Sequence, residues 1–554
     1  MNEQDLAPYF RTHVDDRRTR RGTQVAATLL QSLATEPDEQ RRLQIFSQLD
    51  EVLTSVANSA QPPIRAHYDF FAVPFAFFSR LQSGIAHGEA PAENLLPAAP
   101  GKALDDIDPV PSTFWRRPDS IPQQDLYHGF GRVGPNWPQG ALWEYAGPKL
   151  NYGVNPGFEA RSGPVKIRVK FGEQRSEAFA ARIFWALGYN VDPTDYCEGL
   201  KLRYNRRFFR EFNLRKEIQT QFRFLGLPLY TMKLQKRRDP FSFIAAAVMT
   251  DGRQISGSQL RQELLTDPGK PPEGPVDSFR EEVEERVEYL LTVPANVQTR
   301  NSALHSIGPW KFGDLRHEAH RELRGAGLLA AWIGWYDSRF HNTRLKVASE
   351  DGAPRLYHSF SDLGGGLGRG KGLFSGKSER PNEFLWEFTE PAKVQGKGRM
   401  TIPFRITGYR PMEKNPAFEQ MTLDDARWMA RLIGQLSERQ IVECLIGSGF
   451  DSAEARLYTE KLISRRDRMV CDLGLAAEIP PLRPFGVNKR LNYDPREQRP
   501  VSVRCPISLA RNLRNSHAPV VPGWGSEREG ERQHFGRQAR GIAPKSNVCG
   551  NVRN

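Results

Sequence analysis

Apolar residues recur along the chain at helical and at strand spacing, and these spacings predict its first elements. In residues 23–34 and 41–57 they recur every three or four positions, which predicts two amphipathic helices. Residues 163–172 alternate instead, with Val and Ile separated by Lys and Arg. This period of two predicts a strand with one apolar and one cationic face. Helical spacing returns over residues 175–190, so we expect the strand to lead directly into a helix.

Helical spacing also covers several segments in the second half of the chain. Residues 277–294 form an amphipathic pattern that ends at a Pro, and residues 317–336 become wholly apolar towards their end, as buried helices do. Two or three further amphipathic helices are expected between residues 423 and 474. Residues 354–360 have a strand pattern and run into the sequence SDLGGGLGRGKG, which predicts a glycine-rich loop.

Shifts in composition divide these elements into regions of an α+β protein. No internal repeat is evident, and periodicity disappears near residue 476, where Pro, Arg, Asn and Gly dominate. The expected regions are a helical N-terminal region (1–84), an extended Pro-rich linker (85–140), two parts of an α+β core (141–250 and 251–475), and a basic, mostly disordered tail (476–554).

Charge and composition narrow the classes of partner. The chain has 554 residues, of which 39% are hydrophobic and 26% charged, as in soluble globular proteins. Its net charge of +13 makes anionic partners such as phosphates or nucleic acid plausible. From Pro481 onward, however, the chain has 14 Lys and Arg but only 5 Asp and Glu, so most of the excess positive charge lies in the tail. This weakens an interpretation of the whole protein as a nucleic-acid-binding protein.

Cysteine usage and the start of the chain favour a cytoplasmic protein. The five cysteines are scattered and form no CxxC pair, which fits a reducing compartment. The first residues lack the basic and apolar regions of a secretory signal. The most apolar early run, residues 70–78, is too short to span a bilayer. We therefore expect no transmembrane segment.

Two acids and an amide follow buried elements in the second half of the chain. The apolar run 317–336 ends at Asp337, Asn342 follows five residues later, and Asp362 follows the strand 354–360. A magnesium ion takes hard oxygen ligands, usually carboxylate and amide oxygens together with substrate phosphates. A further carboxylate is needed to orient an attacking hydroxyl. This order of residues is what a magnesium-dependent phosphoryl-transfer site requires.

The same residues carry a family resemblance. "DSRFHN" followed by "DLG" resembles the D-x-x-x-x-N and D-F-G motifs of protein-kinase-like enzymes. "LYHSFSDLGGGLG" is similar to the metal-binding region of the phosphatidylinositol kinases, an atypical branch, and to a set of uncharacterised bacterial proteins. The resemblance implies that Asp337 is the catalytic base, that Asn342 and Asp362 hold Mg²⁺, and that Arg339 contacts phosphate. It departs from the family pattern at Trp335, where many kinases have His, and no A-P-E-like motif is evident.

The resemblance extends upstream and implies a bilobal kinase-like core with lobes at 141–250 and 251–475. Kinase-like enzymes pair a strand Lys with a helix Glu that together hold the ATP phosphates. Lys170 and Glu177 match this pair, with Lys166 and Glu173 as the alternative. Residues 147–158 could form a hairpin that covers the phosphates with backbone N–H groups.

Other interpretations stay open from the sequence. A kinase-like fold could also serve as a non-catalytic nucleotide-binding scaffold, a pseudokinase. Residues 201–240 mix cations with aromatic residues, as single-stranded nucleic-acid-binding surfaces do, although an amphipathic element with buried aromatics is the simpler explanation. His317 and His320 share a helical face, but no third metal ligand is evident. His341 and His358 are expected to be structural.

Overall fold

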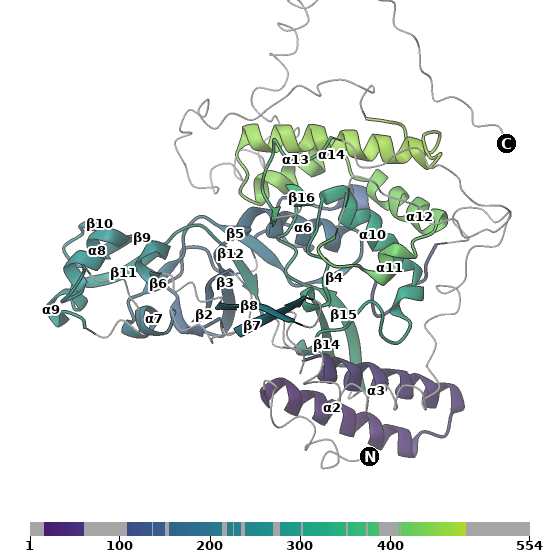
Figure 1. The fold of residues 1–554 in the computed structure, drawn as a ribbon, viewed down its shortest axis with the longest axis horizontal. Helices are drawn as coiled ribbons and strands as arrows, with labels where there is room; N and C mark the ends of the chain where they lie inside the picture. Colours follow the sequence, from purple (N-terminus) through teal and green to yellow (C-terminus); the bar gives the residue numbers. More distant parts are fainter. Residues whose placement is uncertain are drawn as a thin grey trace, which may run out of the picture. The chain divides into compact units, whose positions relative to one another are not determined.

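The computed structural model is a mixed α+β protein (Figure 1). Parts of several predictions lie outside the residues that it describes: the apolar run 70–78, the end of the helical region before residue 84, and the tail beyond residue 482. The structure describes residues 16–59, 108–135, 137–149, 155–212, 219–224, 227–233, 239–269, 278–300, 303–350, 353–372, 375–386, 409 and 411–482.

An antiparallel sheet of five strands carries the predicted strand 163–172 near its centre. That strand, β3 (Val165–Lys170), pairs with a strand on either side, and the helix α6 (Gln174–Ala186) follows it as predicted. Apolar residues of β3 enter a hydrophobic core, whereas those of α6 enter another. The strand order is β1 (Glu144–Pro148), β2 (Gly157–Ser162), β3, β12 (Ala295–Thr299) and β5 (Thr194–Cys197).

The chain between β5 and β12 forms an additional sheet. Although β5 and β12 are neighbours, residues 198–294 separate them in sequence. Most of this insertion packs in the same core as the first sheet. The second sheet has the order β10 (Gln254–Ser256), β9 (Ile244–Met249), β11 (Val287–Thr292) and β6 (Lys201–Arg203).

The insertion corrects two predictions. The helix expected over 277–294 is wrong, because only α9 (Glu281–Glu284) is helical before the chain enters β11. Val283, Val287 and Leu290 have helical spacing, but pairing of β11 with β9 and β6 overrides it. The boundary expected at residue 250 also cuts through both sheets, since β3 and β9 lie before it and their respective partners β12 and β11 lie after it.

A third sheet joins the N-terminal helices to the predicted metal-binding segments. The hairpin of β14 (Thr343–Glu350) and β15 (Ala353–Phe360) fills the chain between Asn342 and Asp362. The helices α2 (Asp16–Thr35) and α3 (Glu39–Ser59), both predicted, pack against β13 at its edge (Figure 1). The sheet order is β13 (His305–Gly308), β14, β15 and β4 (Asn190–Val191).

Helices surround the apolar segment that precedes Asp337. That segment forms α10 (Arg321–Ile333), every residue of which is buried. The predicted helices after residue 421 are α12 (Leu423–Gly434), α13 (Glu438–Gly447) and α14 (Ser452–Asp472), and they share one core with α6 and α10. Trp332 on α10 donates its indole N–H to the backbone of Leu462 on α14, which helps to fix the end of α10.

Candidate functional site

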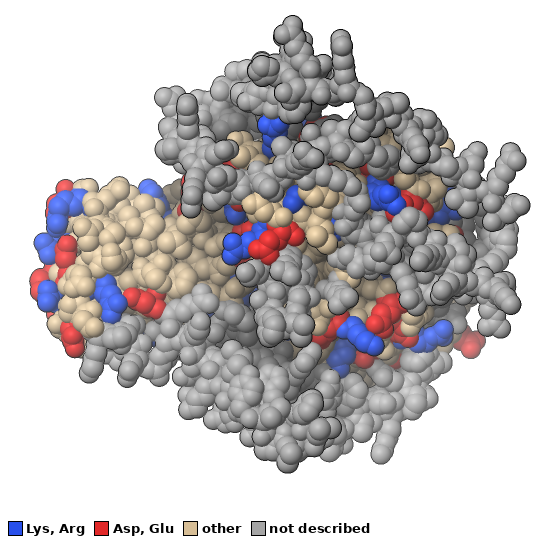
Figure 2. Space-filling model, turned by 45° about the horizontal axis from the view of Figure 1, so that its top comes forward, with Lys and Arg blue, Asp and Glu red and all other residues tan. Residues whose placement is uncertain are grey.

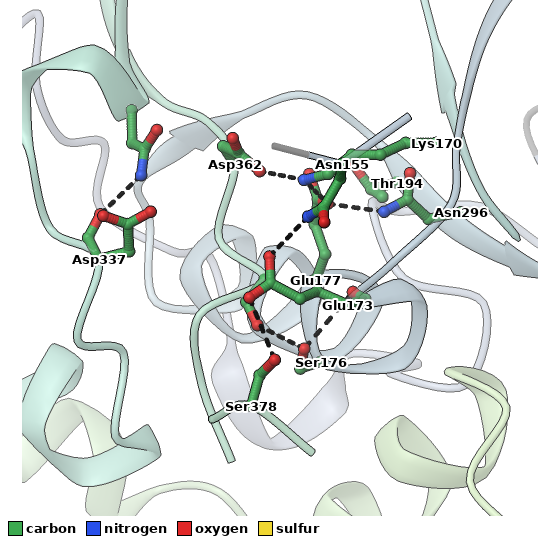
Figure 3. Close-up of polar contacts among 12 residues, drawn as sticks. Asn155, Lys170, Glu173, Ser176, Glu177, Thr194, Asn296, Asp337, Asp362 and Ser378 are labelled. Carbon is green, nitrogen blue, oxygen red and sulfur yellow. Dashed lines mark hydrogen bonds and ion pairs between the residues drawn. The ribbon is translucent and has the colours of Figure 1, made fainter. Parts of the chain in front are cut away.

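The cation at the end of β3 and the acid on α6 form a buried ion pair. Nζ of Lys170 lies 2.7 Å from Oε2 of Glu177, and each side chain is only 6% exposed. Asn296 on β12 donates its side-chain N–H to the same oxygen over 2.6 Å (Figure 3). Lys166 stays exposed, as its place on the cationic face of the strand predicts, and Glu173 has other partners. Of the two pairings left open by the sequence, the structure forms Lys170 with Glu177.

Asp362 contributes a second carboxylate to Lys170. Its Oδ1 contacts Nζ of Lys170 just after β15 ends. The residue has a left-handed backbone conformation with φ of 55°, which Asp tolerates better than most residues. The side chain of Asp362 is 38% exposed, so part of the carboxylate remains accessible to a further ligand. Lys170 therefore joins the ends of β3 and β15 to α6.

The shared ammonium sets the charge state of this group. Burial alone would lower the pKa of Lys170, but the charges of Asp362 and Glu177 outweigh burial and raise it. Burial would raise the pKa of Asp362, but Lys170 and Lys149 hold it well below its usual range. The pKa of Glu177 is raised, because burial outweighs the attraction of Lys170. At neutral pH the group thus contains a charged Lys170 and an ionised Asp362.

Asp337, Arg339 and Asn342 form a second group just after α10. Nη2 of Arg339 donates to Oδ2 of Asp337 over 3.0 Å. Nδ2 of Asn342 donates to the backbone oxygen of Asp337 over 2.6 Å, so the amide holds the loop in place with its nitrogen. Burial raises the pKa of Asp337, and the charge of Arg339 offsets part of this rise. Asp337 is thus a half-buried carboxylate with a cationic partner.

Backbone hydrogen bonds connect this second group to the segment that carries Asp362. The N–H of Ser361 donates to the oxygen of Asn342 over 2.8 Å, and that of Tyr336 donates to the oxygen of Gly365 over 2.9 Å. A Cβ on Gly365 would lie only 2.9 Å from Cβ of Asp337. The glycine-rich loop can therefore pass against Asp337 only because this position lacks a side chain. All six predicted site residues lie on segments joined by these contacts.

Glu173, the alternative acid, and two residues of the expected hairpin complete the surroundings. Glu173 accepts hydrogen bonds from Asn155 over 3.0 Å and from Ser378 over 3.1 Å, and burial raises its pKa to about 7. Nζ of Lys149 donates to the backbone of Asn155, and burial together with the charge of Lys170 lowers its pKa to about 7. Lys149 and Asn155 belong to the expected phosphate hairpin 147–158, whereas nothing in the pattern around Asn296 marked it.

A small cavity lies behind the ion pair. It has a volume of about 10 Å³, which is room for about one water molecule, and is lined in part by Glu177, Asp192, Thr194, Phe360 and Asp362. Drug-sized ligands usually occupy about 300–1,000 Å³. This cavity suits water molecules rather than a nucleotide, so a nucleotide would have to approach Lys170 from elsewhere.

The aromatic residues of the 201–240 block are largely core residues where the structure describes them. Phe208 and Phe209 on α7 (Arg206–Glu211) are completely buried, and Phe212 is 8% exposed. Buried rings cannot stack on bases, so these three give no nucleic-acid platform. The side chain of Phe222 lies outside the described residues. On the face drawn in Figure 2, described basic and acidic side chains are interleaved.

No family model, no curated protein and no solved structure matches the chain. Among the helices of the described ranges, none is long and apolar enough to cross a membrane. The roles of the site residues must therefore be argued from their contacts.

Proposed function

We propose that this chain is an atypical kinase-like phosphotransferase with a bilobal core, which uses ATP and Mg²⁺ to phosphorylate an unidentified hydroxyl acceptor. The observation that carries the proposal is the contact of Lys170 with both Glu177 and Asp362. In protein kinases a strand Lys pairs with a helix Glu, and an Asp of the metal loop must lie beside them. Here three distant segments bring the same residue types together.

The proposed division of labour follows from the charges. Lys170, held by Glu177, would bind the ATP phosphates, and the accessible carboxylate of Asp362 would turn to Mg²⁺ when the nucleotide enters. The side-chain nitrogen of Asn342 donates to the backbone oxygen of Asp337, so the amide oxygen would be the atom that binds the metal ion. Catalysis would then rest on positioning and charge neutralisation.

Asp337 and Arg339 would act on the acceptor side. The half-buried carboxylate of Asp337 would orient the acceptor hydroxyl, and Arg339 would contact the transferred phosphate. The ion pair between them holds both side chains in one place. The raised pKa of Asp337 suits a group that takes up a proton during the transfer.

A thermal-shift experiment tests the nucleotide and metal site. ATP with Mg²⁺ should raise the melting temperature of the chain more than ATP with a chelator does. Asp362→Asn should lose this metal-dependent part, whereas Asp251→Asn, which changes an exposed acid paired with Arg253, should keep it. The absence of any shift, or an equal shift in both variants, would contradict the site.

A non-catalytic scaffold is the second candidate. The direct contact of Lys170 with Asp362 shows that the pair can satisfy its charges without a metal ion, which a pseudokinase would tolerate. Transfer of a radiolabelled γ-phosphate to water, to the chain itself or to added acceptors separates the two. Metal-dependent binding without any transfer favours the scaffold.

A further inference from the structure

A buried cluster outside the proposed phosphoryl-transfer site joins α3 to the core. Glu51 on α3 lies between two imidazoles: its Oε1 is 2.7 Å from Nε2 of His317, and its Oε2 is 3.0 Å from Nε2 of His358. Both rings are 1% exposed. His317 begins the short 3-10 helix η5 (His317–Ala319), and His358 lies on β15. The cluster thus ties together three segments that are distant in sequence.

The hydrogen bonds of His317 make this cluster unusual. Its Nδ1 lies 2.7 Å from the backbone oxygen of Lys311, which can only accept, so Nδ1 must carry a proton. In the neutral ring Nε2 would then present a lone pair to the carboxylate of Glu51. That contact is favourable if a proton lies on Nε2 or on the carboxyl group, or if a cation lies between the nitrogen and the oxygen.

His358 differs in one respect, because the partner of its Nδ1 is a hydroxyl, which can either donate or accept. Its Nδ1 lies 2.9 Å from Oγ1 of Thr113, and its Nε2 also faces the carboxylate of Glu51. Imidazoles that bind a metal ion through Nε2 usually donate Nδ1–H to an oxygen, which fixes the tautomer. Phe114 stacks on the His358 ring at 4.0 Å between centroids, and Trp310 meets both rings edge-on. Two oriented nitrogens therefore converge on one carboxylate.

We propose that Glu51, His317 and His358 form a binding site for a transition-metal ion of the zinc type, which fastens the N-terminal helices to the core. The three ligand atoms lie within 4.8 Å of one another. Bonds of about 2.0–2.1 Å at tetrahedral angles place two ligand atoms about 3.3 Å apart. The nitrogen–oxygen separations of 2.7 and 3.0 Å would open by about 0.6 and 0.3 Å on metal binding, and the two nitrogens, which lie within 4.8 Å of each other, would settle at the same separation of about 3.3 Å. Two imidazoles and a carboxylate form a known zinc ligand set, with water in the fourth position.

This ligand set differs from the one that the sequence suggested. His317 and His320 share a helical face in the sequence pattern, but His320 instead contacts Glu322 over 3.2 Å. The second and third ligands come from β15 and α3. The site is also separate from the proposed magnesium site, because neither Asn342 nor Asp362 takes part. Loss of one site would leave the ligands of the other intact.

Metal content measured on the full-length chain tests the proposal. The chain is stripped with a chelator, mixed with one equivalent of Zn²⁺ and passed through a desalting column. About one zinc per chain should remain, and the melting temperature should rise. Glu51→Gln, which nearly preserves side-chain shape, and His358→Gln should lose the bound zinc and the shift. His305→Ala, which removes an exposed histidine of β13, should retain both.

A substitution at the hydrogen-bond partner of His358 and an absorption spectrum distinguish loss of the metal site from misfolding. Thr113→Val leaves all three ligands in place and should weaken zinc binding by about 10- to 100-fold. Cobalt(II) bound to the wild-type chain should give a visible spectrum without a thiolate charge-transfer band, because no Cys is a ligand. Failure to retain zinc, equal retention in Glu51→Gln and His358→Gln, or a thiolate band would overturn the proposal.

Discussion

Replacement of Lys170 with Met should destabilise the chain far more than the same change at Lys166. Lys170 and Glu177 are each 6% exposed, so Lys170→Met leaves a buried carboxylate with Asn296 as its remaining partner. Breaking a buried pair from one side costs about 3–5 kcal/mol. The second partner, Asp362, is 38% exposed and can be solvated, so we expect a loss near the lower end, about 3 kcal/mol. Lys166→Met, at the exposed beginning of the same strand, should change stability by less than about 0.5 kcal/mol.

The assay is urea unfolding of both variants and of the wild type at several pH values. A loss of about 3 kcal/mol corresponds to a factor of more than about 100 in the folding equilibrium. The pKa of Glu177 is already raised by burial, and loss of Lys170 should raise it further. A carboxyl whose pKa is higher in the folded state stabilises that state at low pH and loses this contribution as pH rises. The loss of unfolding free energy in Lys170→Met should thus be smaller at pH 5 than at pH 8. Equal effects of both substitutions, or a pH-independent deficit, would refute the reasoning.

Three further predictions address other parts of the chain. Burial raises the pKa of Glu173 to about 7, so wild-type stability should decline between about pH 4.5 and 7, and melting curves of Glu173→Gln should lack this decline. The new Cβ of Gly365→Ala would displace Asp337, so phosphate transfer should slow by up to about 100-fold with little change in nucleotide affinity. The control Gly134→Ala should behave like wild type, because no heavy atom lies within 4 Å of its new Cβ. Phe208→Ala should cost about 3–5 kcal/mol in denaturant unfolding and leave oligonucleotide binding unchanged, because this ring lies in the core.

Local periodicity predicted much of the secondary structure but not the pairing of segments. It located α2, α3, α6 and α10, because each of these helices is buried on one face or on all sides. It failed at 277–294, where the apolar spacing fits a helix and only the neighbouring strands make β11 extended. Likewise, no local signal indicates that β12 pairs with β3, so the boundary expected at residue 250 was misplaced.

In the candidate site, too, the sequence indicated single residues but not the contacts between distant segments. Lys170, Glu177 and Asp362 could be named in advance because each follows or begins a predicted element in a recognisable order. Asn296 could not, since its contact with Glu177 depends on a strand that lies 119 positions further along the chain. The Glu51 cluster has no local signal for the same reason, because Glu51 and His317 are 266 positions apart in the sequence.

Calorimetric titration of the full-length chain with ATP tests the central claim most directly. In the presence of Mg²⁺ the wild type should bind one ATP, and a chelator should weaken this binding at least about tenfold, a difference of about 1.4 kcal/mol. Asp362→Asn should bind ATP with the weaker affinity whether or not Mg²⁺ is present. Binding that is absent in the wild type, or that shows the same dependence on Mg²⁺ in Asp362→Asn, would contradict a nucleotide and metal site at Lys170 and Asp362.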